Sequence, residues 1–160
     1  MNILAIDPGY DKLGFAVFDV QKKQLLCSGL IKTKRSTTTA QRLLTVYNGL
    51  CDVLRDHSIS SIVVENLFFF KNQKTIVNVS KVIGVIELIA GQNAIEVALL
   101  TPLQIKQAIT GYGQADKKSV QKMIELELKE TFNHKEDDEV DAIACGYAFC
   151  LQQRFNKATR

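Results

Sequence analysis

The chain has 160 residues, of which 46% are hydrophobic and 23% charged, a composition typical of a globular protein and not of a disordered or fibrous one. This length predicts a single domain over residues 1–160, with one core and no room for a second catalytic domain. Lys and Arg outnumber Asp and Glu by 20 to 17, a bias that permits a polyanionic partner without demonstrating one.

The first thirty residues predict three strands in an antiparallel meander. A short apolar run over 3–7 ends in Asp7 and the turn pair Pro8-Gly9. Residues 13–20 alternate their side chains between two faces, and residues 25–31 follow after a polar turn.

From Thr39 onward the hydrophobic period changes to that of helices alternating with strands. Leu43, Tyr47, Leu50 and Leu54 recur at helical spacing after the polar run 32–39, which we expect to be a flexible loop. A buried strand over 59–65 follows, and then a helix over 75–90, a strand over 94–99, and helices over 116–130 and 137–153. This order predicts an α/β fold: a five-stranded mixed sheet with helices on both faces.

The remaining composition argues for an intracellular protein. Asp7 interrupts the apolar opening before a signal-peptide core is complete, and the apolar stretch 82–90 is short and carries Glu87, so we expect no segment of membrane-spanning length. The cysteines form no Cys-x-x-Cys pair, which favours reduced thiols in a cytoplasmic location over disulfides or zinc ligands. These residues are Cys27, Cys51, Cys145 and Cys150.

Four carboxylates are placed where they can converge. Asp7 and Glu65 each end a predicted strand, whereas Asp138 and Asp141 are spaced i, i+3 on one face near the start of the last helix. If the two strands are neighbours and the helix packs across their ends, these charges repel one another unless a cation neutralises them. Mg²⁺ is the expected ion, because it binds oxygen ligands, and paired Mg²⁺ ions catalyse phosphodiester hydrolysis.

Each acid also has a simpler interpretation. Asp7, which precedes Pro-Gly, could simply be a turn residue whose side chain accepts hydrogen bonds from the backbone. Glu65 could be a solvated residue at the end of its strand. Acids in the first turn of a helix are favoured by the helix dipole, and capping alone explains two of the three acids Asp137, Asp138 and Glu139, whereas Asp141 is less easily explained in this way. Asp137 and Asp141 also share a face at i, i+4, so Asp137 stays an alternative to Asp138 as a ligand.

An ordered set of motifs resembles the RuvC Holliday-junction resolvases of the ribonuclease H-like superfamily. The resemblance runs from residue 3 to about residue 147. It rests on Ile6-Asp7-Pro8-Gly9, Arg42-Leu43 with Tyr47, Glu65 with Phe68 and Lys71-Asn72, Gly84, Gln104-Ile105-Lys106-Gln107, the run 111–117 from Gly111 to Lys117, and the run 138–142. The chain departs from the family pattern at 80–83, where Ser-Lys-Val-Ile replaces a Gly-Gln-Ala-Arg run.

The resemblance implies a ribonuclease H-like fold and a metal-dependent endonuclease site. By it, Asp7, Glu65, Asp138 and Asp141 bind two Mg²⁺ ions, for which Mn²⁺ substitutes. Lys106 and Lys117 match the family's basic residues near the active site, where an ammonium group stabilises charge on the scissile phosphate. An ordinary solvated lysine is the alternative for each. No nucleotide cofactor is expected.

The resemblance also implies DNA contacts outside the carboxylates. Phe68 matches an aromatic residue associated with base unstacking, with core packing as its alternative; since three consecutive phenylalanines cannot all face one core, Phe69 is a second candidate. Basic residues and a glycine loop are expected at the DNA backbone, although a solvated helix face and an ordinary turn explain them as well. These residues are Lys71, Lys74, Lys81, Gly111 and Gly113.

The expected function is the resolution of four-way DNA junctions in recombination and repair. A homodimer would nick two opposed strands symmetrically and leave ligatable 5′-phosphate ends. The sequence is compatible with either a bacterial or a phage origin. In a bacterium, a RuvA/RuvB branch-migration complex is the expected partner. Rival interpretations are a junction-binding protein without activity, another ribonuclease H-like nuclease, and an actin-like or sugar-kinase-like protein, for which the chain is too short.

Overall fold

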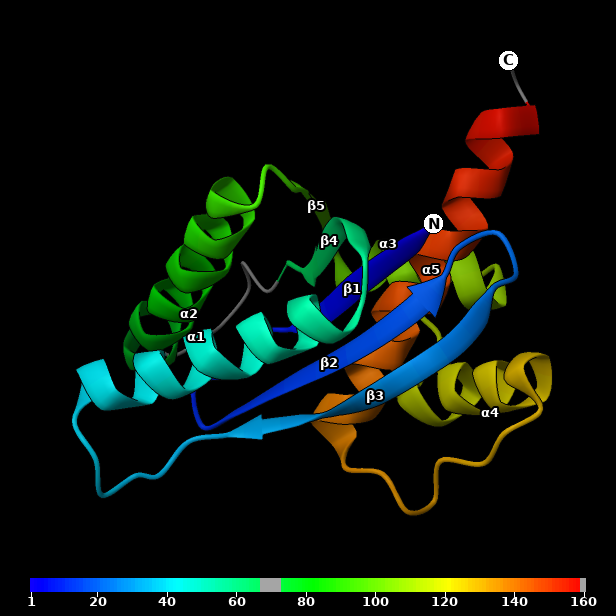
Figure 1. Cartoon of the computed structure of the whole chain (residues 1–160). Helices are drawn as coiled ribbons and strands as arrows, with labels where there is room; N and C mark the ends of the chain where they lie inside the picture. Colours follow the sequence, from blue (N-terminus) through cyan, green and yellow to red (C-terminus); the bar gives the residue numbers. More distant parts are fainter. Residues whose placement is uncertain (67–72, 159–160) are drawn as a thin grey trace.

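Five strands form one mixed sheet in the order β3-β2-β1-β4-β5 (Figure 1). The structure is a computed structural model that describes residues 1–66 and 73–158, without the side chains of 73–74 and 154–158. The meander β1 (Asn2–Asp7), β2 (Lys12–Asp19) and β3 (Gln24–Lys32) is antiparallel, whereas β4 (Ile59–Glu65) and β5 (Glu96–Leu100) join parallel to β1. The predicted mixed sheet is confirmed.

Helices cover both faces of the sheet, as the sequence predicts. Helices α1 (Thr39–Asp56) and α2 (Gln73–Gln92) pack on one face, where they bury Leu4, Ile6 and Val64. Helices α3 (Pro102–Thr110), α4 (Lys117–Leu128) and α5 (Asp137–Ala158) lie on the other face. Each strand therefore divides its alternate side chains between two separate cores.

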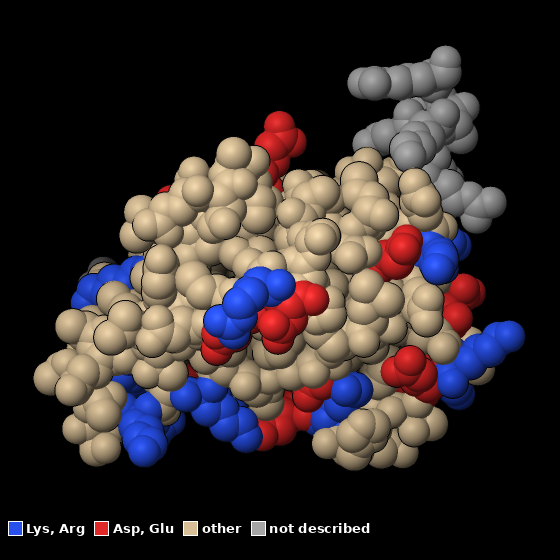
Figure 2. Space-filling view, viewed as in Figure 1, with Lys and Arg blue, Asp and Glu red and all other residues tan. Residues whose placement is uncertain are grey.

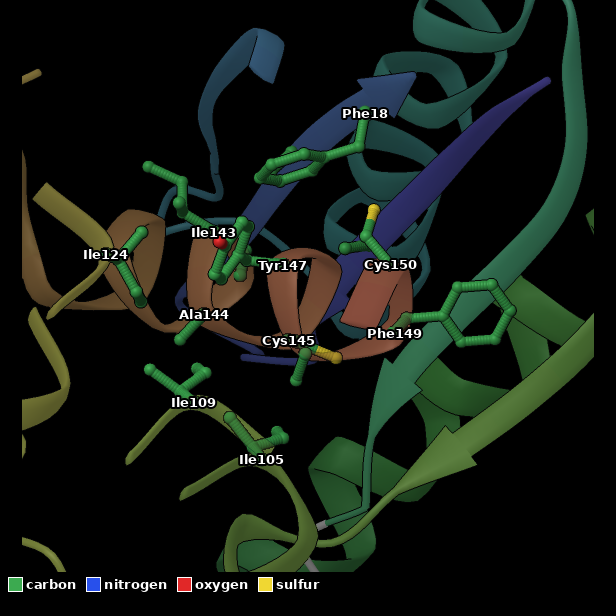
Figure 3. Packing of buried hydrophobic residues seen from close by; sticks show 14 of the residues in the cluster. Phe18, Ile105, Ile109, Ile124, Ile143, Ala144, Cys145, Tyr147, Phe149 and Cys150 are labelled. Atoms are coloured by element: carbon green, nitrogen blue, oxygen red, sulfur yellow. The ribbon is translucent and has the colours of Figure 1, made fainter. Parts of the chain in front are cut away.

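Helix α5 is the centre of the second layer. It contacts β1, β2, β3 and β4 as well as α3 and α4. In Figure 3, the α5 side chains Ile143, Ala144 and Tyr147 point in different directions, some toward Phe18 of the sheet and some toward the smaller helices. A helix that is apolar over most of its circumference must be buried on several sides, and this one is.

The two-residue period of the strands decides which side chains face α5. Ile3 and Ala5 of β1 belong to the core under α5, so the next residue of that series, Asp7, faces α5 as well. Val63 of β4 has the same orientation and is followed by Glu65. The alternation of apolar residues thus brings both strand-end acids to the face where α5 begins.

Three details differ from the sequence-based expectations. Helix α3 was not predicted, although Thr101 begins it with a capping box to Gln104. The loop expected to be flexible is held by several hydrogen bonds, among them one from Thr33 Oγ1 to the carbonyl of Tyr10 at 2.8 Å. The elements that were predicted have bounds within a few residues of those observed, apart from α5, which continues to Ala158.

Helix α2 is longer and more apolar than expected. Residues 75–92 have a mean hydropathy of 1.3, which by length and composition alone is enough to cross a membrane, so the expectation that no segment approaches that length was wrong. The helix buries Val82, Ile86 and Ile89 against the sheet. Its outer side leaves Val77 and Leu88 more than half exposed. Helix α2 therefore packs one face on the core and leaves Val77 and Leu88 exposed on the opposite face, with the exposed Lys81 between them.

Candidate active site

Two adjacent strands end in acids at the same edge of the sheet. Strands β1 and β4 pair in parallel, with Ile6 opposite Val64, so Asp7 and Glu65 end neighbouring strands. Asp7 is buried, with 8% of its surface exposed, and Glu65 is partly buried. Parallel pairing makes this meeting unavoidable, because both chains reach the edge in the same direction.

The start of α5 brings the other two acids to this edge. A cleft of about 550 Å³ is lined by Asp7, Glu65, Asp138 and Asp141, together with the loop that follows β1 and the first turns of α2. A smaller neighbouring cleft of about 210 Å³ shares Glu65 and Asp141 with the first one and adds two lysines. The structure therefore brings together all four carboxylates singled out in the sequence.

The proximity of the acids strongly perturbs their ionisation. Burial, followed by the charges of Glu65, Asp141 and Asp138, raises the pKa of Asp7 to about 8. Burial, followed by the charge of Asp141, raises the pKa of Glu65 to about 7. Burial also raises the pKa of Asp141, against a hydrogen bond from Lys117. Such shifts are typical of functional carboxylates and cost the folded protein stability at neutral pH.

Two lysines partly balance these charges. The Lys117 ammonium lies 2.9 Å from Asp141 Oδ2 and 3.4 Å from Asp137 Oδ2, at the first helical position of α4. The pKa of Lys117 is raised, because its contacts with these acids outweigh its partial burial. Lys106 of α3 lines the smaller cleft and lowers the pKa of Glu65 through its charge. Both lysines thus lie at the carboxylate cluster.

The structure separates the two candidates at the start of α5. The side chain of Asp137 is 87% exposed and contacts Lys117. Asp138 instead lines the larger cleft, and its charge contributes to the raised pKa of Asp7. The i, i+3 pair of Asp138 and Asp141 is therefore the one directed at the strand ends.

The donor set fits a hard divalent cation. Among the described residues, no three acidic, thiol or imidazole groups are close enough to hold an ion as they stand, and Asp141 is engaged by Lys117. The converging groups nevertheless all offer carboxylate oxygens, the ligands that Mg²⁺ and Mn²⁺ prefer. Their raised pKa values mean that a cation among them relieves a repulsion that is already present.

The first turn of α5 is attached to the meander by charged side chains. Glu136 pairs with both Lys12 and Lys32, and these lysines lower its pKa to about 2. One turn further on, Glu139 accepts hydrogen bonds from Ser28 and Lys135, each at 2.6 Å. In Figure 2, acidic and basic side chains lie against each other on this face instead of forming one basic patch.

A buried arginine fixes the loop between Asp7 and β2. Arg42 of α1 stacks over the Tyr10 ring at 3.8 Å, donates to the Tyr10 carbonyl at 3.0 Å and pairs with Asp11. Asp11 also pairs with the exposed Arg35. Because this loop lines the larger cleft, Arg42 supports the site from outside it. The motif Arg42-Leu43 was noted in the sequence, but only its family resemblance marked it.

The comparisons with known proteins agree with this site. The sequence model of the family described as crossover junction endodeoxyribonuclease RuvC matches residues 3–150. The chain belongs to the RuvC family. It is 36% identical over 157 residues to the RuvC of Thermosipho melanesiensis, covering 97% of this chain and 100% of the relative. It is 35% identical over 162 residues to that of Natranaerobius thermophilus, covering 100% and 99%.

A solved RuvC structure confirms the ribonuclease H-like architecture. Thermus thermophilus RuvC in complex with a Holliday junction substrate matches with a TM-score of 0.91 at 25% identity. The match covers 98% of this chain and 96% of that chain. The resemblance drawn from the sequence motifs is therefore confirmed over nearly the full length.

The DNA-contact residues expected from the RuvC resemblance fall into two groups. Lys81 is exposed on α2; Gly111 caps α3 in a left-handed conformation with a φ of 76°, and Gly113 packs against Leu103. Both glycines therefore have a local structural reason for their presence. Of the other four, three lie outside the described residues and one, Lys74, is described without its side chain. These are Phe68, Phe69, Lys71 and Lys74.

Proposed function

We propose that this protein is a metal-dependent Holliday-junction resolvase that cuts two opposed strands of a four-way DNA junction. The observation that carries the proposal is the cleft at the strand ends, where four carboxylates and two lysines converge. Relatives bearing the name crossover junction endodeoxyribonuclease, and one relative bound to a Holliday junction substrate, support the choice of substrate.

The carboxylates would hold Mg²⁺, with Mn²⁺ as a substitute. Asp7 and Glu65 from the sheet, with Asp138 and Asp141 from α5, provide enough oxygen ligands for a pair of ions. When bound, the metal supplies an activated water and stabilisation of the leaving oxygen, the known chemistry of two-metal sites. The expected products carry 3′-hydroxyl and 5′-phosphate ends that a ligase can seal.

The lysines have a role that the acids cannot fill. Lys117 and Lys106 flank Glu65 and Asp141 at the smaller cleft, so a phosphate entering there meets two ammonium groups. These groups would hold the scissile phosphate and offset the negative charge that grows on it. Phe68 or Phe69 would unstack a base beside the cut, while Lys71, Lys74, Lys81 and the loop of Gly111 and Gly113 contact the DNA backbone.

Two-fold symmetry of the junction favours a homodimer. An isologous dimer presents one site to each of two opposed strands, which accounts for paired cuts. The side of α2 that faces away from the sheet is a candidate surface for such pairing, because Val77 and Leu88 are more than half exposed there. The exposed Lys81 lies between them, so pairing through this surface would place Lys81 at the dimer contact instead of at the DNA backbone. We place the enzyme in the cytoplasm, with a RuvA/RuvB-type motor as its partner in a bacterial host.

Junction cleavage by the purified protein tests this function. The protein is incubated with a mobile four-way junction and with a linear duplex of the same sequence, with and without Mg²⁺, beside Asp7→Asn. We expect symmetric nicks in the junction alone, requiring both the metal and Asp7, while Asp7→Asn still binds the junction. Tight binding without cleavage across several junction sequences, with Mn²⁺ also tried, would instead indicate a binding protein.

A further inference from the structure

Strand β2 and helix α5 touch through their backbones at one point beside the carboxylates. Gly14 of β2 is paired directly with Asp7 of β1 and shares its orientation toward α5. A Cβ built on Gly14 would lie 1.9 Å from the carbonyl oxygen of Asp138 and 2.5 Å from its carbonyl carbon. The first turn of α5 therefore rests on β2 where only glycine leaves room for it.

This contact differs in kind from the other crowded helix–sheet glycines. A Cβ on Gly49 of α1 would meet the Ile31 side chain at 2.7 Å, and one on Gly146 would meet the Phe18 ring at 2.6 Å. Those nearest neighbours are side-chain atoms, and the end of the Ile31 side chain can rotate away from Gly49. The neighbour of Gly14 is the backbone of Asp138, so a side chain at position 14 can be accommodated only by moving the start of α5 or the start of β2.

The start of α5 has little freedom to move elsewhere. Ser28 of β3 donates a hydrogen bond to Glu139, and the same carboxylate is bound by Lys135. Glu136 is bound by two lysines of the meander. These polar contacts fix the position of α5 along the sheet, above β2 and β3. Gly14 sets how closely α5 approaches the sheet.

We propose that Gly14 is a positioning residue that sets the distance between Asp7 on the sheet and the Asp138–Asp141 pair on α5. Because both acids of α5 are carried by the turn that rests on Gly14, a shift of that turn changes the spacing of the metal ligands while all four ligands remain in the chain. The inference rests on the proposed metal-dependent function, and it adds a residue that neither binds metal nor contacts substrate.

Metal affinity is the readout that separates positioning from simple stability. Gly14→Ala is compared with wild type and with Gly49→Ala, a crowded helix–sheet glycine on the opposite face of the sheet. Mn²⁺ binding is measured by isothermal titration calorimetry at a temperature where all three proteins are folded by circular dichroism. We expect Gly14→Ala to lose at least about tenfold in Mn²⁺ affinity and Gly49→Ala to keep the wild-type value while unfolding at lower temperature.

Junction cleavage gives the second arm of the test. Gly14→Ala should lower kcat by about tenfold to a hundredfold while KM for the junction changes by less than about twofold, since ligand spacing and not DNA contact is altered. Wild-type Mn²⁺ affinity in folded Gly14→Ala would overturn the inference. No Mn²⁺ binding by the wild type would instead overturn the proposed metal site, and so the two failures are distinguishable.

A second variant covers the case in which Gly14→Ala does not fold. Ser28→Ala removes the hydrogen bond that holds the first turn of α5 against β3 and adds no bulk. It should lower Mn²⁺ affinity by about threefold or more, because the same turn becomes less firmly placed. If Ser28→Ala binds Mn²⁺ like the wild type, placement of this turn does not control the site and the inference fails.

Discussion

Asp7 is held where its own charge destabilises the fold. Its pKa rises from an ordinary value of 3.8 to about 8, mainly through burial and then through Glu65 and Asp141. The folded state therefore keeps a proton that the unfolded chain would release. As the pH rises from about 4 to about 8, Asp7 ionises in the unfolded chain but stays protonated in the folded protein, and so the free energy of unfolding falls progressively. Such a residue is explained by function and not by stability.

Asp7→Asn should therefore stabilise the metal-free protein while removing its activity. We expect little gain at about pH 3, where the aspartate is mostly protonated in both states, and a gain of about 1–3 kcal/mol at pH 8. Urea unfolding at both pH values, in the presence of a chelator, measures the difference. Asp52→Asn, at an exposed helix position, controls for the loss of one charge. An equal gain at both pH values would show that Asp7 is not strained by ionisation.

Lys117 provides a second test at the level of one residue. Lys117→Ala should lower kcat about a hundredfold or more, because the amine would offset the charge that grows on the scissile phosphate, while junction affinity falls only by the loss of one phosphate contact among many. Its neighbour Lys118 is exposed and lines neither of the two clefts, so Lys118→Ala is the matched control. Single-turnover cleavage and gel-shift assays measure the two quantities. Equal losses in both variants would mean that only overall positive charge matters.

Arg42 and Arg35 bind the same carboxylate from very different environments. The side chain of Arg42 is 9% exposed, whereas that of Arg35 is 83% exposed. Arg42→Met should lower the free energy of unfolding by about 2–4 kcal/mol, since it removes a buried partner of Asp11 and of the Tyr10 carbonyl. Arg35→Met should cost less than about 1 kcal/mol. Chemical denaturation compares them, and similar values would contradict a supporting role for Arg42.

At the scale of elements, the alternation of apolar residues was the most informative part of the sequence. It predicted the strands that end in Asp7 and Glu65 and, with the i, i+3 pair on α5, the meeting of four acids. Helix α3 escaped prediction because it is only nine residues long and buries only Ile105 and Ile109. Its capping box and Pro102 at the first turn were the available signals.

Contacts between distant segments were beyond reach of sequence patterns. Gly14 lies in the series Gly14, Ala16 and Phe18 that faces α5, but nothing local reveals that backbone carbonyl 138 rests on it. Arg42 and Asp11 are 31 positions apart, so their pairing becomes visible only when α1 is placed on the sheet. Composition and period can indicate which face is buried, but not which atoms meet there.

The uncovered face of α2 leads to a prediction about assembly. Leu88→Glu places a charge among the exposed side chains of α2 and should convert the proposed dimer to a monomer without unfolding it. Leu126→Glu changes an equally exposed leucine on α4 and should leave the dimer intact. Light scattering after size-exclusion chromatography gives the mass of each. A wild type that is itself monomeric, or a dimeric Leu88→Glu, would exclude α2 as the dimer surface.

At the scale of the whole molecule, the metal and the fold should be thermodynamically linked. The four acids are brought together only in the folded state, so we expect Mg²⁺ to bind the folded chain far better than the unfolded one. At a Mg²⁺ concentration a hundred times its Kd, the free energy of unfolding should rise by about 2.7 kcal/mol. Differential scanning calorimetry of the wild type and Asp7→Asn tests this, and an equal rise in both would place the ion elsewhere.

The order of the site residues along the chain has a consequence for protein synthesis. Asp7 precedes Asp141 by more than a hundred positions and is therefore synthesised first, whereas Asp141 lies in α5, which also covers the sheet beneath the acids. A growing polypeptide, or a prematurely terminated one that lacks α5, has neither the complete ligand set nor a covered core. On the proposed function, such a polypeptide would hold no complete metal site and would be unable to cleave DNA until α5 docks.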